Sequence, residues 1–566
     1  MASKPSKPKS FTFSFILFII AFLFFTINYS KKQQNEFQNS TTYPKIATNP
    51  EWFEFIAREL GEENMKLGLV NMDGMLDKLQ TEAKLVEVHF NQVDNNLKWS
   101  DLFPQYIDED SPSKCPEIPM PKFEDYEDLD VVVAKVPCNE FREDGGMRDV
   151  FRLQVNLVVA NLLVRSGRKE NGGNYRPKLA VFIGSCGPMW ELFSCDELLW
   201  HGGNSWIYMP QLKRIKQKVL MPVGTCQLAP PYAQLGEINF CFLFTNKRLF
   251  AIYLFVFLAE YPLFSEELWR SHNYNNTHSQ PREAYVTVLH SSEAYVCGAI
   301  ALAQSIIQSN STKDLVLLAD DHISPKSIKG LQSAGWKIKR IQRIRSPLSE
   351  KDTYNEWNYS KLRIWQLKEY DKVMFIDSDF IVTKNIDEFF IYPQLSAVEN
   401  NKHIFNSGLM LVEPSECTFK TLMKKRLVVA SYNGGDQGFL NEMFTWWHRL
   451  PTKLNYLKYF IDIDDQVRKI PKDLYAVHYL GLKPWACYRD YDCNWDKELF
   501  QMFASDSANE RWWDVYDAMP EKLREYCSLS PEMDARIWKY RRIAEEGNYT
   551  DGHWKINVKD PRQRFT

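Results

Sequence analysis

From residue 282 onward, short apolar runs alternate with amphipathic stretches along the chain. Residues 284–289, 315–319 and 336–341 combine β-branched and aromatic side chains in the manner of buried strands. Between the runs, apolar residues recur at helical spacing behind serines that can cap a helix. This alternation predicts an α/β fold with a mostly parallel central sheet. The same patterns predict a helix over residues 361–370 and further strands over 395–398, 409–412 and 475–480.

One strand of this series ends in acidic residues. Residues 372–379, KVMFIDSD, are five mostly apolar positions followed by Asp377 and Asp379, with one serine between them. In an open α/β sheet, ligands bind at the carboxyl ends of the strands. Two carboxylates there suit Mg²⁺ or Mn²⁺ and, through the metal, a diphosphate. A solvated acidic turn has the same short pattern, so the interpretation depends on the rest of the chain.

Three further turns in this region carry polar groups. The first, LHSSEAY at residues 289–295, follows a strand and ends in Tyr295, which either stacks on a nucleotide base or packs as a core residue. The other two, FNSG at 405–408 and GGDQG at 434–438, contain glycine and present backbone amides and a carboxylate. Together with the acidic strand end, these turns have the right chemistry to form one site.

The segment HYLGLKPW, residues 478–485, places a histidine at a predicted strand end. His478 is either the third protein ligand of a metal or a hydrogen-bonded packing residue. Lys483, five residues later, either neutralises a diphosphate leaving group or is a solvated cation.

Composition sets wider limits on function. A chain of 566 residues has room for two to four domains, and 45% hydrophobic with 14% aromatic residues is ample for packed cores. The formal net charge is −3 at pH 7, so nothing indicates a nucleic-acid partner. The first strand of the α/β region also lacks the glycine pattern of NAD-binding proteins.

The N-terminal pattern predicts a membrane anchor. Residues 11–27 are apolar and uncharged, and Lys4, Lys7 and Lys9 precede them. The run is longer than the apolar part of an ordinary signal peptide, and no convincing cleavage site follows it. The positive charge in front of the run predicts a cytosolic N-terminus and a lumenal remainder.

Sequons and cysteines agree with a lumenal location. The sequons lie at Asn39, Asn275, Asn310, Asn358 and Asn548. In an oxidising compartment, most of the eleven cysteines are candidates for disulfides whose connectivity stays open. Cys297 lies within an apolar helix pattern, and we expect it to be an inert buried thiol.

The chain is predicted to contain six parts. They are a cytosolic tail over residues 1–10, a transmembrane anchor over 11–29, a flexible stem over 30–50, an accessory region over 51–280, a catalytic domain over 281–494 and a helical closing region over 495–566. The accessory region has strand-like runs at 129–136 and 179–184. We interpret it as a disulfide-braced structural subdomain rather than as a direct acceptor-binding element.

The motifs after residue 282 resemble those of the glycogenin-type retaining glycosyltransferases. The D-x-D and H-x-x-G-x-K-P-W elements match that family residue for residue. Within it, the chain is most similar to the plant UDP-glucuronate:xylan α-glucuronosyltransferases, through stretches such as NYSKLRIWQL, FNSGLMLVEPS, YNGGDQGFLNE and HYLGLKPWACYRDYDCNWD. Residues 237–262 do not fit this pattern. We interpret them as a segment retained by an incorrect gene model rather than as a membrane-touching insertion.

The resemblance implies a nucleotide-sugar-binding fold of the GT-A kind and a site made of named residues. Asp377, Asp379 and His478 would bind Mn²⁺. Leu289, Ser291 and Tyr295 would line the nucleotide pocket, Lys361, Asn406, Asp436 and Gln437 would surround the donor sugar, Gly481 and Lys483 would meet the diphosphate, and Ser378, Ser407 and Gly408 would complete the donor site. Either Asp436 or Gln437 attacks the anomeric carbon, or electrostatics alone assist the transfer. Arg363 is our candidate for binding the donor's C6 carboxylate, although it is equally typical of a solvated helix charge.

The implied function is transfer of glucuronic acid from UDP-glucuronate to the xylan backbone. The linkage would be α-1,2 with retention, the enzyme would depend on Mn²⁺, and it would lie in the Golgi membrane as a single-pass type II protein. One alternative is the same chemistry with another UDP-sugar or acceptor. A second is a non-catalytic membrane scaffold for polysaccharide synthesis.

Overall fold

A computed structural model describes residues 49–61, 65–72, 83–111, 114–138, 147–165, 178–230, 281–401, 404–460, 468–560 and 562. The predicted anchor at 11–29, nearly all of the stem at 30–50 and the doubtful segment at 237–262 lie outside these residues. Within them, no helix combines the length and apolarity needed to cross a bilayer. The chain divides into two units, residues 1–59 and 60–566. Helix α2 (Glu51–Leu60) belongs almost wholly to the first unit and buries one apolar face.

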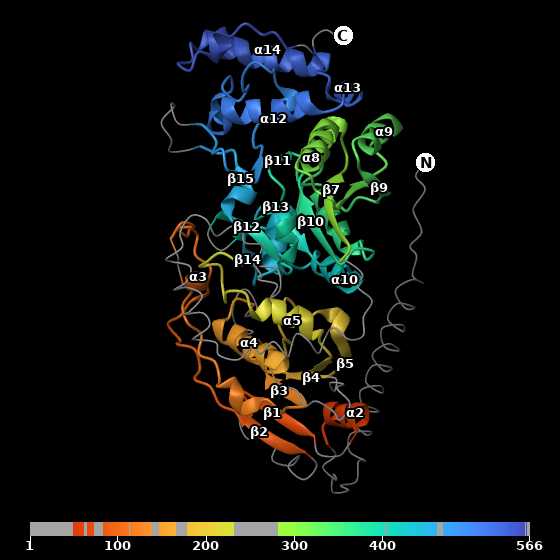
Figure 1. Ribbon diagram of the computed structural model, residues 1–566, viewed down its shortest axis with the longest axis vertical. Helices are drawn as coiled ribbons and strands as arrows, with labels where there is room; N and C mark the ends of the chain where they lie inside the picture. The colour runs from red at the N-terminus through yellow and green to blue at the C-terminus, as the bar shows by residue number, and fades with distance from the viewer. Residues whose placement is uncertain are drawn as a thin grey trace, which may run out of the picture. The chain divides into compact units, whose positions relative to one another are not determined.

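The second unit begins with a six-stranded sheet in the order β2-β1-β3-β4-β6-β5. Its strands are β1 (Lys66–Val70), β2 (Lys84–Val88), β3 (Val131–Lys135), β4 (Leu179–Ile183), β5 (Leu198–Gly202) and β6 (Ser205–Tyr208). The first four strands of that order are parallel, and β5 and β6 form an antiparallel hairpin. Helix α4 (Val150–Arg165), which is apolar on nearly all sides, packs on this sheet, and α5 (Leu212–Val219) packs on α4 (Figure 1).

A second sheet of seven strands has the order β14-β12-β13-β10-β7-β8-β9. Its strands are β7 (Glu283–Leu289), β8 (Asp314–Ala319), β9 (Lys337–Arg340), β10 (Lys372–Ile376), β12 (Ser396–Asn401), β13 (Ile404–Val412) and β14 (His448–Arg449). The four strands from β10 to β9 are parallel, whereas β13 runs antiparallel to both of its neighbours. The predicted α/β region is thus confirmed in its strand–helix alternation, and its sheet is mixed.

Helices surround this second sheet. They are α8 (Val296–Gln308), α9 (Pro325–Ser333), α10 (Glu416–Lys425) and α11 (Asp436–Met443). The helix predicted over residues 361–370 is instead a 3₁₀ helix, η6 (Asn358–Gln366). A small third sheet joins β11 (Phe380–Val382), β16 (Ala476–His478) and β15 (Tyr456–Leu457).

The end of the chain is helical, as the sequence predicts for residues after 494. It contains η10 (Glu498–Phe503), α12 (Asp506–Ala518), α13 (Glu521–Arg524) and α14 (Pro531–Glu546). Ser505 and Ser530 cap α12 and α14 by accepting backbone N–H groups of the first turn. Shorter helical segments are α3 (Trp99–Leu102), η2 (Phe123–Tyr126), η3 (Cys195–Glu197), η5 (Glu293–Tyr295), η7 (Asp387–Ile391), η8 (Thr452–Leu454), η9 (Pro484–Ala486), η11 (Glu525–Cys527) and η12 (His553–Lys555).

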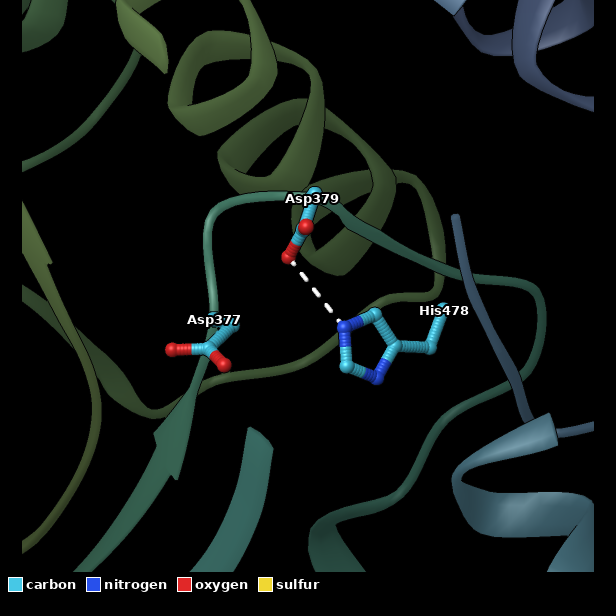
Figure 2. Close-up of side chains that lie close together, drawn as sticks. All are labelled: Asp377, Asp379 and His478. Atoms are coloured by element: carbon cyan, nitrogen blue, oxygen red, sulfur yellow. Dashed lines mark ion pairs between the residues drawn. The ribbon is translucent and has the colours of Figure 1, made fainter. Parts of the chain in front are cut away.

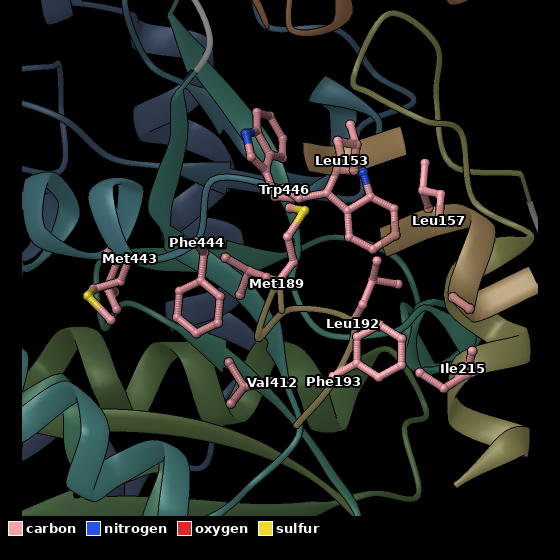
Figure 3. Packing of buried hydrophobic residues seen from close by; sticks show 14 of the residues in the cluster. Leu153, Leu157, Met189, Leu192, Phe193, Ile215, Val412, Met443, Phe444 and Trp446 are labelled. Carbon is pink, nitrogen blue, oxygen red and sulfur yellow. The ribbon is translucent and has the colours of Figure 1, made fainter. Parts of the chain in front are cut away.

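One hydrophobic core is shared by the six-stranded and seven-stranded sheets. Figure 3 shows Leu153 and Met189, from the region of the six-stranded sheet, packed beside Phe444 and Trp446, from the region of the seven-stranded sheet. The indole N–H of Trp190 donates to the backbone oxygen of Met443 at 2.8 Å, which adds a polar contact to this apolar junction. The two sheets therefore form one packed body.

Five disulfides connect the described residues. They are Cys115–Cys226, Cys138–Cys186, Cys195–Cys417, Cys297–Cys527 and Cys487–Cys493. The prediction of an inert thiol at Cys297 is wrong, because α8 packs against η11, where Cys527 lies. An apolar helix pattern indicates burial, but it does not show which segment covers the helix.

Candidate metal and catalytic site

The carboxylates of Asp377 and Asp379 and the imidazole of His478 lie together at the end of β10 (Figure 2). One ligand atom from each side chain lies within 4.8 Å of the others. Nε2 of His478 is 3.4 Å from Oδ1 of Asp379. The structure thus brings together the three residues that the sequence predicts as metal ligands.

A short ladder explains how residues a hundred positions apart meet. β11 begins directly after Asp379 and pairs antiparallel with β16, so that Phe380 lies opposite His478. The rings of Phe380 and His478 stack with centroids 4.2 Å apart. The amide of Tyr479 donates to the backbone oxygen of Asp379 at 2.9 Å. The register of this ladder therefore fixes the distance between the histidine and the second aspartate.

Asparagine side chains determine which imidazole nitrogen faces the carboxylates. Oδ1 of Asn406 accepts the amide of Gly408 at 2.8 Å, and it also accepts Nδ2 of Asn455 at 3.0 Å. Oδ1 of Asn455 therefore faces Nδ1 of His478 at 3.2 Å, so Nδ1 carries the proton. Nε2 is left with its lone pair toward Asp379, which is the arrangement of a metal-ligating histidine with a hydrogen-bonded second nitrogen.

The absence of a side chain at Gly408 leaves room for His478 and Asp377. A Cβ there would lie 2.8 Å from Cε1 of His478 and 3.2 Å from Oδ2 of Asp377. Any side chain would thus push these two groups apart. Two carboxylate oxygens and an imidazole lone pair that converge in this way fit a divalent cation that prefers oxygen and nitrogen ligands.

Lys361 of η6 links the metal-binding carboxylates to the GGDQG turn. Its Nζ lies 2.7 Å from Oδ2 of Asp436 and 3.3 Å from Oδ1 of Asp377. It also donates to the backbone oxygen of Ser407 at 3.1 Å. Burial alone would lower the pKa of Lys361, but Asp377 and Asp436 raise it above its usual value. This lysine therefore remains a cation between two carboxylates.

The two aspartates of the D-x-D differ in their electrostatics. Burial raises the pKa of Asp377, although Lys361 opposes the effect. Burial would raise the pKa of Asp379, but the pKa is lowered, chiefly by the positive charge of Lys483. Nζ of Lys483 donates to Oδ2 of Asp379 at 2.7 Å, so this lysine is an ion-pair partner in the site rather than a solvated cation.

Gly481 shapes the turn between His478 and Lys483. Its φ angle is +76°, in the left-handed region that favours glycine. A Cβ at this position would also lie 2.3 Å from Oδ1 of Asn494. The turn that carries Lys483 back to Asp379 therefore requires glycine on two grounds.

Asp436 and Gln437 begin helix α11 and are held by hydrogen bonds. Oδ2 of Asp436 accepts from Oγ of Ser407 at 2.8 Å in addition to its pairing with Lys361. The Gln437 amide accepts from the backbone N–H of Ser407 at 3.1 Å and donates to the hydroxyl of Tyr432 at 2.6 Å. Both candidate catalytic residues are thus fixed in orientation.

The predicted nucleotide end lies after β7. Leu289 is buried, and Ser291 has a positive φ of 68°. Oγ of Ser291 accepts from Arg343 at 3.0 Å. The Tyr295 ring meets Trp485 edge to face at 5.9 Å, and Lys483 lies over the same tyrosine ring. Tyr295 is half-buried, so part of its surface is open to a ligand.

The structure does not bring Arg363 together with the other site residues. Its guanidinium donates to the backbone oxygen of Gln342 at 3.1 Å and to Oε1 of Gln366 at 2.8 Å, and it lies over the ring of Phe419. A role in binding the donor carboxylate would require Arg363 to leave these partners. Residues two positions apart do not share a face of a helix, so Arg363 does not follow Lys361 into the site.

Five residues at or beside the site are not among the predicted site residues. They are His290, Arg343, Tyr354, Tyr432 and Asn455. Burial lowers the pKa of His290 to about 4, so this imidazole is neutral beside the site. Only His290 and Tyr432 lie in motifs that the sequence singles out, LHSSEAY and YNGGDQGFLNE. The others reach the site through tertiary contacts.

Comparison with known proteins places this site in a family. The GUX1-5 N-terminal domain matches residues 42–226, and glycosyl transferase family 8 matches residues 286–393. The putative UDP-glucuronate:xylan alpha-glucuronosyltransferase 5 of Arabidopsis thaliana is 48% identical, over 99% of this chain and 98% of that protein. UDP-glucuronate:xylan alpha-glucuronosyltransferase 2 of the same plant is 47% identical, over 90% of this chain and 82% of that protein.

A solved structure of the galactosyltransferase LgtC with donor and acceptor sugar analogs aligns with 43% of this chain and 99% of its own, at 16% identity and a TM-score of 0.31. Family membership rests instead on the near full-length sequence matches, which extend across both sheets and all four site segments. The chain belongs to the family of the plant UDP-glucuronate:xylan alpha-glucuronosyltransferases, within glycosyl transferase family 8.

Proposed function

We propose that this chain transfers glucuronic acid from UDP-glucuronate to the xylan backbone, in α-1,2 linkage, with retention and with dependence on Mn²⁺. The observation that carries the proposal is the assembled group of Asp377, Asp379 and His478, with Lys361 and Lys483 paired to it, in a chain of this family. The donor and the acceptor are taken from the names of the relatives. The chemistry is supported by the residues of the site.

Asp377, Asp379 and His478 would hold Mn²⁺ in this proposal. When bound, the ion would offset the negative charge of the donor diphosphate. Lys483, whose side chain keeps 17% of its surface exposed beside Asp379, would add a second positive charge near the leaving group. Lys361 would keep Asp377 and Asp436 in place without approaching the diphosphate itself.

The fixed positions of Asp436 and Gln437 favour transfer on the face of the leaving group. The Asp436 carboxylate forms an ion pair with Lys361, which weakens it as a nucleophile, and the Gln437 amide oxygen accepts the backbone N–H of Ser407. In this route the bond from the anomeric carbon to the UDP oxygen breaks, and a bond from that carbon to the xylose 2-oxygen forms. The proton of the 2-hydroxyl passes to the departing diphosphate, and Asp436 stabilises the positive charge on the sugar.

We also propose that the protein lies in the Golgi membrane as a single-pass type II protein with its catalytic part in the lumen. Five disulfides support an oxidising compartment. The sequon residues Asn310 and Asn548 are exposed and accessible to glycosylation. We expect the protein to be protected from protease in intact Golgi vesicles. After lysis, it should lose mass on glycosidase treatment. Protease sensitivity in intact vesicles would contradict it.

The activity is tested by incubating the purified protein with xylo-oligosaccharides and a panel of UDP-sugars, with and without Mn²⁺. We expect transfer from UDP-glucuronate that needs the metal and is lost in Asp377→Asn. Transfer from another UDP-sugar instead would refute the donor assignment. Equal support of xylan substitution in plants by wild type and Asp377→Asn would favour a non-catalytic scaffold.

A further inference from the structure

Two loops from distant parts of the sequence meet in front of helix α11. One joins β9 to η6, and the other directly precedes α11. Nδ2 of Asn355 donates to the backbone oxygen of Asn433 at 2.7 Å, and Oγ of Ser346 donates to that of Gly434 at 2.7 Å. A Cβ at Gly435 would lie 2.8 Å from Oδ1 of Asn355, so the loops are in close contact. They form one continuous surface at the edge of the site.

Each loop presents a tyrosine to solvent. Tyr354 is 77% exposed and Tyr432 is 59% exposed, and Leu348 beside them is 50% exposed. Aromatic rings with this much free surface are common where a protein receives a ligand. We refer to Tyr354 and Tyr432 as the rim tyrosines.

One rim tyrosine is anchored to a site residue through its hydroxyl group. The Tyr432 hydroxyl accepts from Nε2 of Gln437 at 2.6 Å. Tyr354 directly precedes Asn355, which holds the two loops together. The hydroxyl end of Tyr432 is thus tied to the donor side of the site, while both rings retain open surface.

Tyr354 lies within electrostatic reach of the metal-binding carboxylates. Burial, followed by the negative charge of Asp379, raises the pKa of its hydroxyl well above the usual value. Most of the side chain is exposed to solvent. The ring of Tyr354 therefore has free surface close to the site.

The loop that carries Tyr432 suits an uncharged sugar chain. Residues 431–435, SYNGG, contain amides, hydroxyls and an aromatic ring but no charged side chain. A pyranose offers C–H faces to aromatic rings and hydroxyls to amides.

We infer that Tyr354 and Tyr432 form an acceptor platform, on which xylosyl rings of the polysaccharide stack next to the residue that receives the sugar. This inference rests on the proposed function and names the acceptor subsite of the same site. Because Tyr432 is bonded to Gln437 and Gln437 follows Asp436, a ring stacked on this platform lies beside the donor sugar position.

The test uses the detergent-solubilised full chain, UDP-glucuronate and xylo-oligosaccharides of increasing length. Tyr354→Ala and Tyr432→Ala should each raise the acceptor KM about tenfold, which corresponds to the free energy of one aromatic contact. The donor KM should change much less. Tyr354→Trp and Tyr432→Trp should keep the acceptor KM close to that of wild type, because tryptophan retains a stacking face. Tyr106→Ala, at a tyrosine that is 75% exposed in the accessory region, is the matched control and should change neither constant.

Direct binding of xylohexaose, measured by calorimetry, separates this inference from the proposed function. Transfer to xylan with an unchanged acceptor KM in both alanine variants would overturn the platform and leave the function standing. Xylohexaose binding that depends on the rim tyrosines, without glucuronate transfer, would support the platform and refute the function. A rise in donor KM alone would assign the two loops to the donor, and failure of wild type both to bind and to transfer would refute both proposals.

Discussion

The orientation of one histidine ring depends on an asparagine that the sequence does not mark. Asn455 accepts from Nδ1 of His478, and Asn406 fixes the amide of Asn455. Residues that hold a metal-binding histidine in this way typically change metal affinity by about 10- to 100-fold when they are removed. Replacing Asn455 therefore tests the metal site without changing any of its three metal-binding residues.

We expect Asn455→Leu to weaken Mn²⁺ binding by at least about tenfold, because Nδ1–H loses its acceptor and the ring loses its fixed orientation. Titration of the free ion by electron paramagnetic resonance measures the affinity without substrate. Asn455→Asp keeps an acceptor oxygen at the same place and should retain most of the affinity. Equal losses in both variants would mean that Asn455 acts only by packing.

At this scale, sequence predicts those site residues that lie in continuous motifs. Asp377, Asp379 and His478 stand at strand ends, where the pattern of apolar and polar positions is informative. Asn455 and Arg343 reach the site only through tertiary contacts, which the pattern of a single sequence does not predict. Arg363 shows the converse, since it lies close to Lys361 in the sequence but its guanidinium donates to Gln342, away from the other site residues.

Among the elements, η12 and helix α12 are joined by an ionic contact. Nδ1 of His553 lies 2.9 Å from Asp551, and Nε2 lies 2.7 Å from Asp506 at the start of α12. Burial opposes protonation, but the two carboxylates raise the pKa of His553 to about 9. The imidazole also stacks on Trp495 at 4.6 Å. The protonated histidine therefore ties the chain end to the closing region.

This contact predicts a pH dependence of stability. Because the folded-state pKa of His553 is raised, its stabilisation is complete below about pH 6.5 and is lost as the pH rises through about 9. The upper limit is about 3 kcal/mol, reduced by solvent screening of the half-exposed Asp506. We expect the Tm difference between wild type and His553→Gln to shrink from pH 6 to pH 9.5. A difference that stays constant over this range would exclude the ionic contribution.

The disulfides predict a ranking of stability effects. Cys297–Cys527 spans 230 residues, whereas Cys487–Cys493 spans 6. In the chain-entropy description, the longer link stabilises the fold by about 5 kcal/mol and the shorter by about 2 kcal/mol. Cys297→Ala/Cys527→Ala should therefore lower Tm more than Cys487→Ala/Cys493→Ala. The reverse order in calorimetry would show that local packing, not loop closure, dominates.

Strands were predicted unevenly for physical reasons. β3 and β4 are continuous apolar runs, and the sequence predicts both. β2 is a largely exposed edge strand with a mixed pattern, and β5 alternates half-buried with exposed residues, so neither shows a simple apolar run. Pairing with neighbours, rather than their own composition, makes these segments strands.

For the whole molecule, the buried carboxylate of Glu191 joins the two large sheets. It accepts the backbone amides of Thr445 at 3.0 Å and Trp446 at 3.2 Å and the hydroxyl of Thr445 at 3.0 Å. Glu191→Ala would leave these donors unpaired in the core, at a cost of about 3 kcal/mol. We expect a lower midpoint of denaturant unfolding. Glu191→Gln keeps an acceptor oxygen and should lose less, and equal losses would contradict this account.

The ladder between β11 and β16 has a consequence for how such chains can diverge. Pairing of Phe380 with His478 sets the geometry of the metal ligands, so the length of chain between them is of little importance. One residue inserted within β11 would turn its side chains to the opposite face and separate His478 from Asp379. One residue inserted in the exposed turn at Lys472 should leave Mn²⁺ binding intact. We therefore expect relatives to differ in the length of their surface turns but not in the length of the three-residue strand β11.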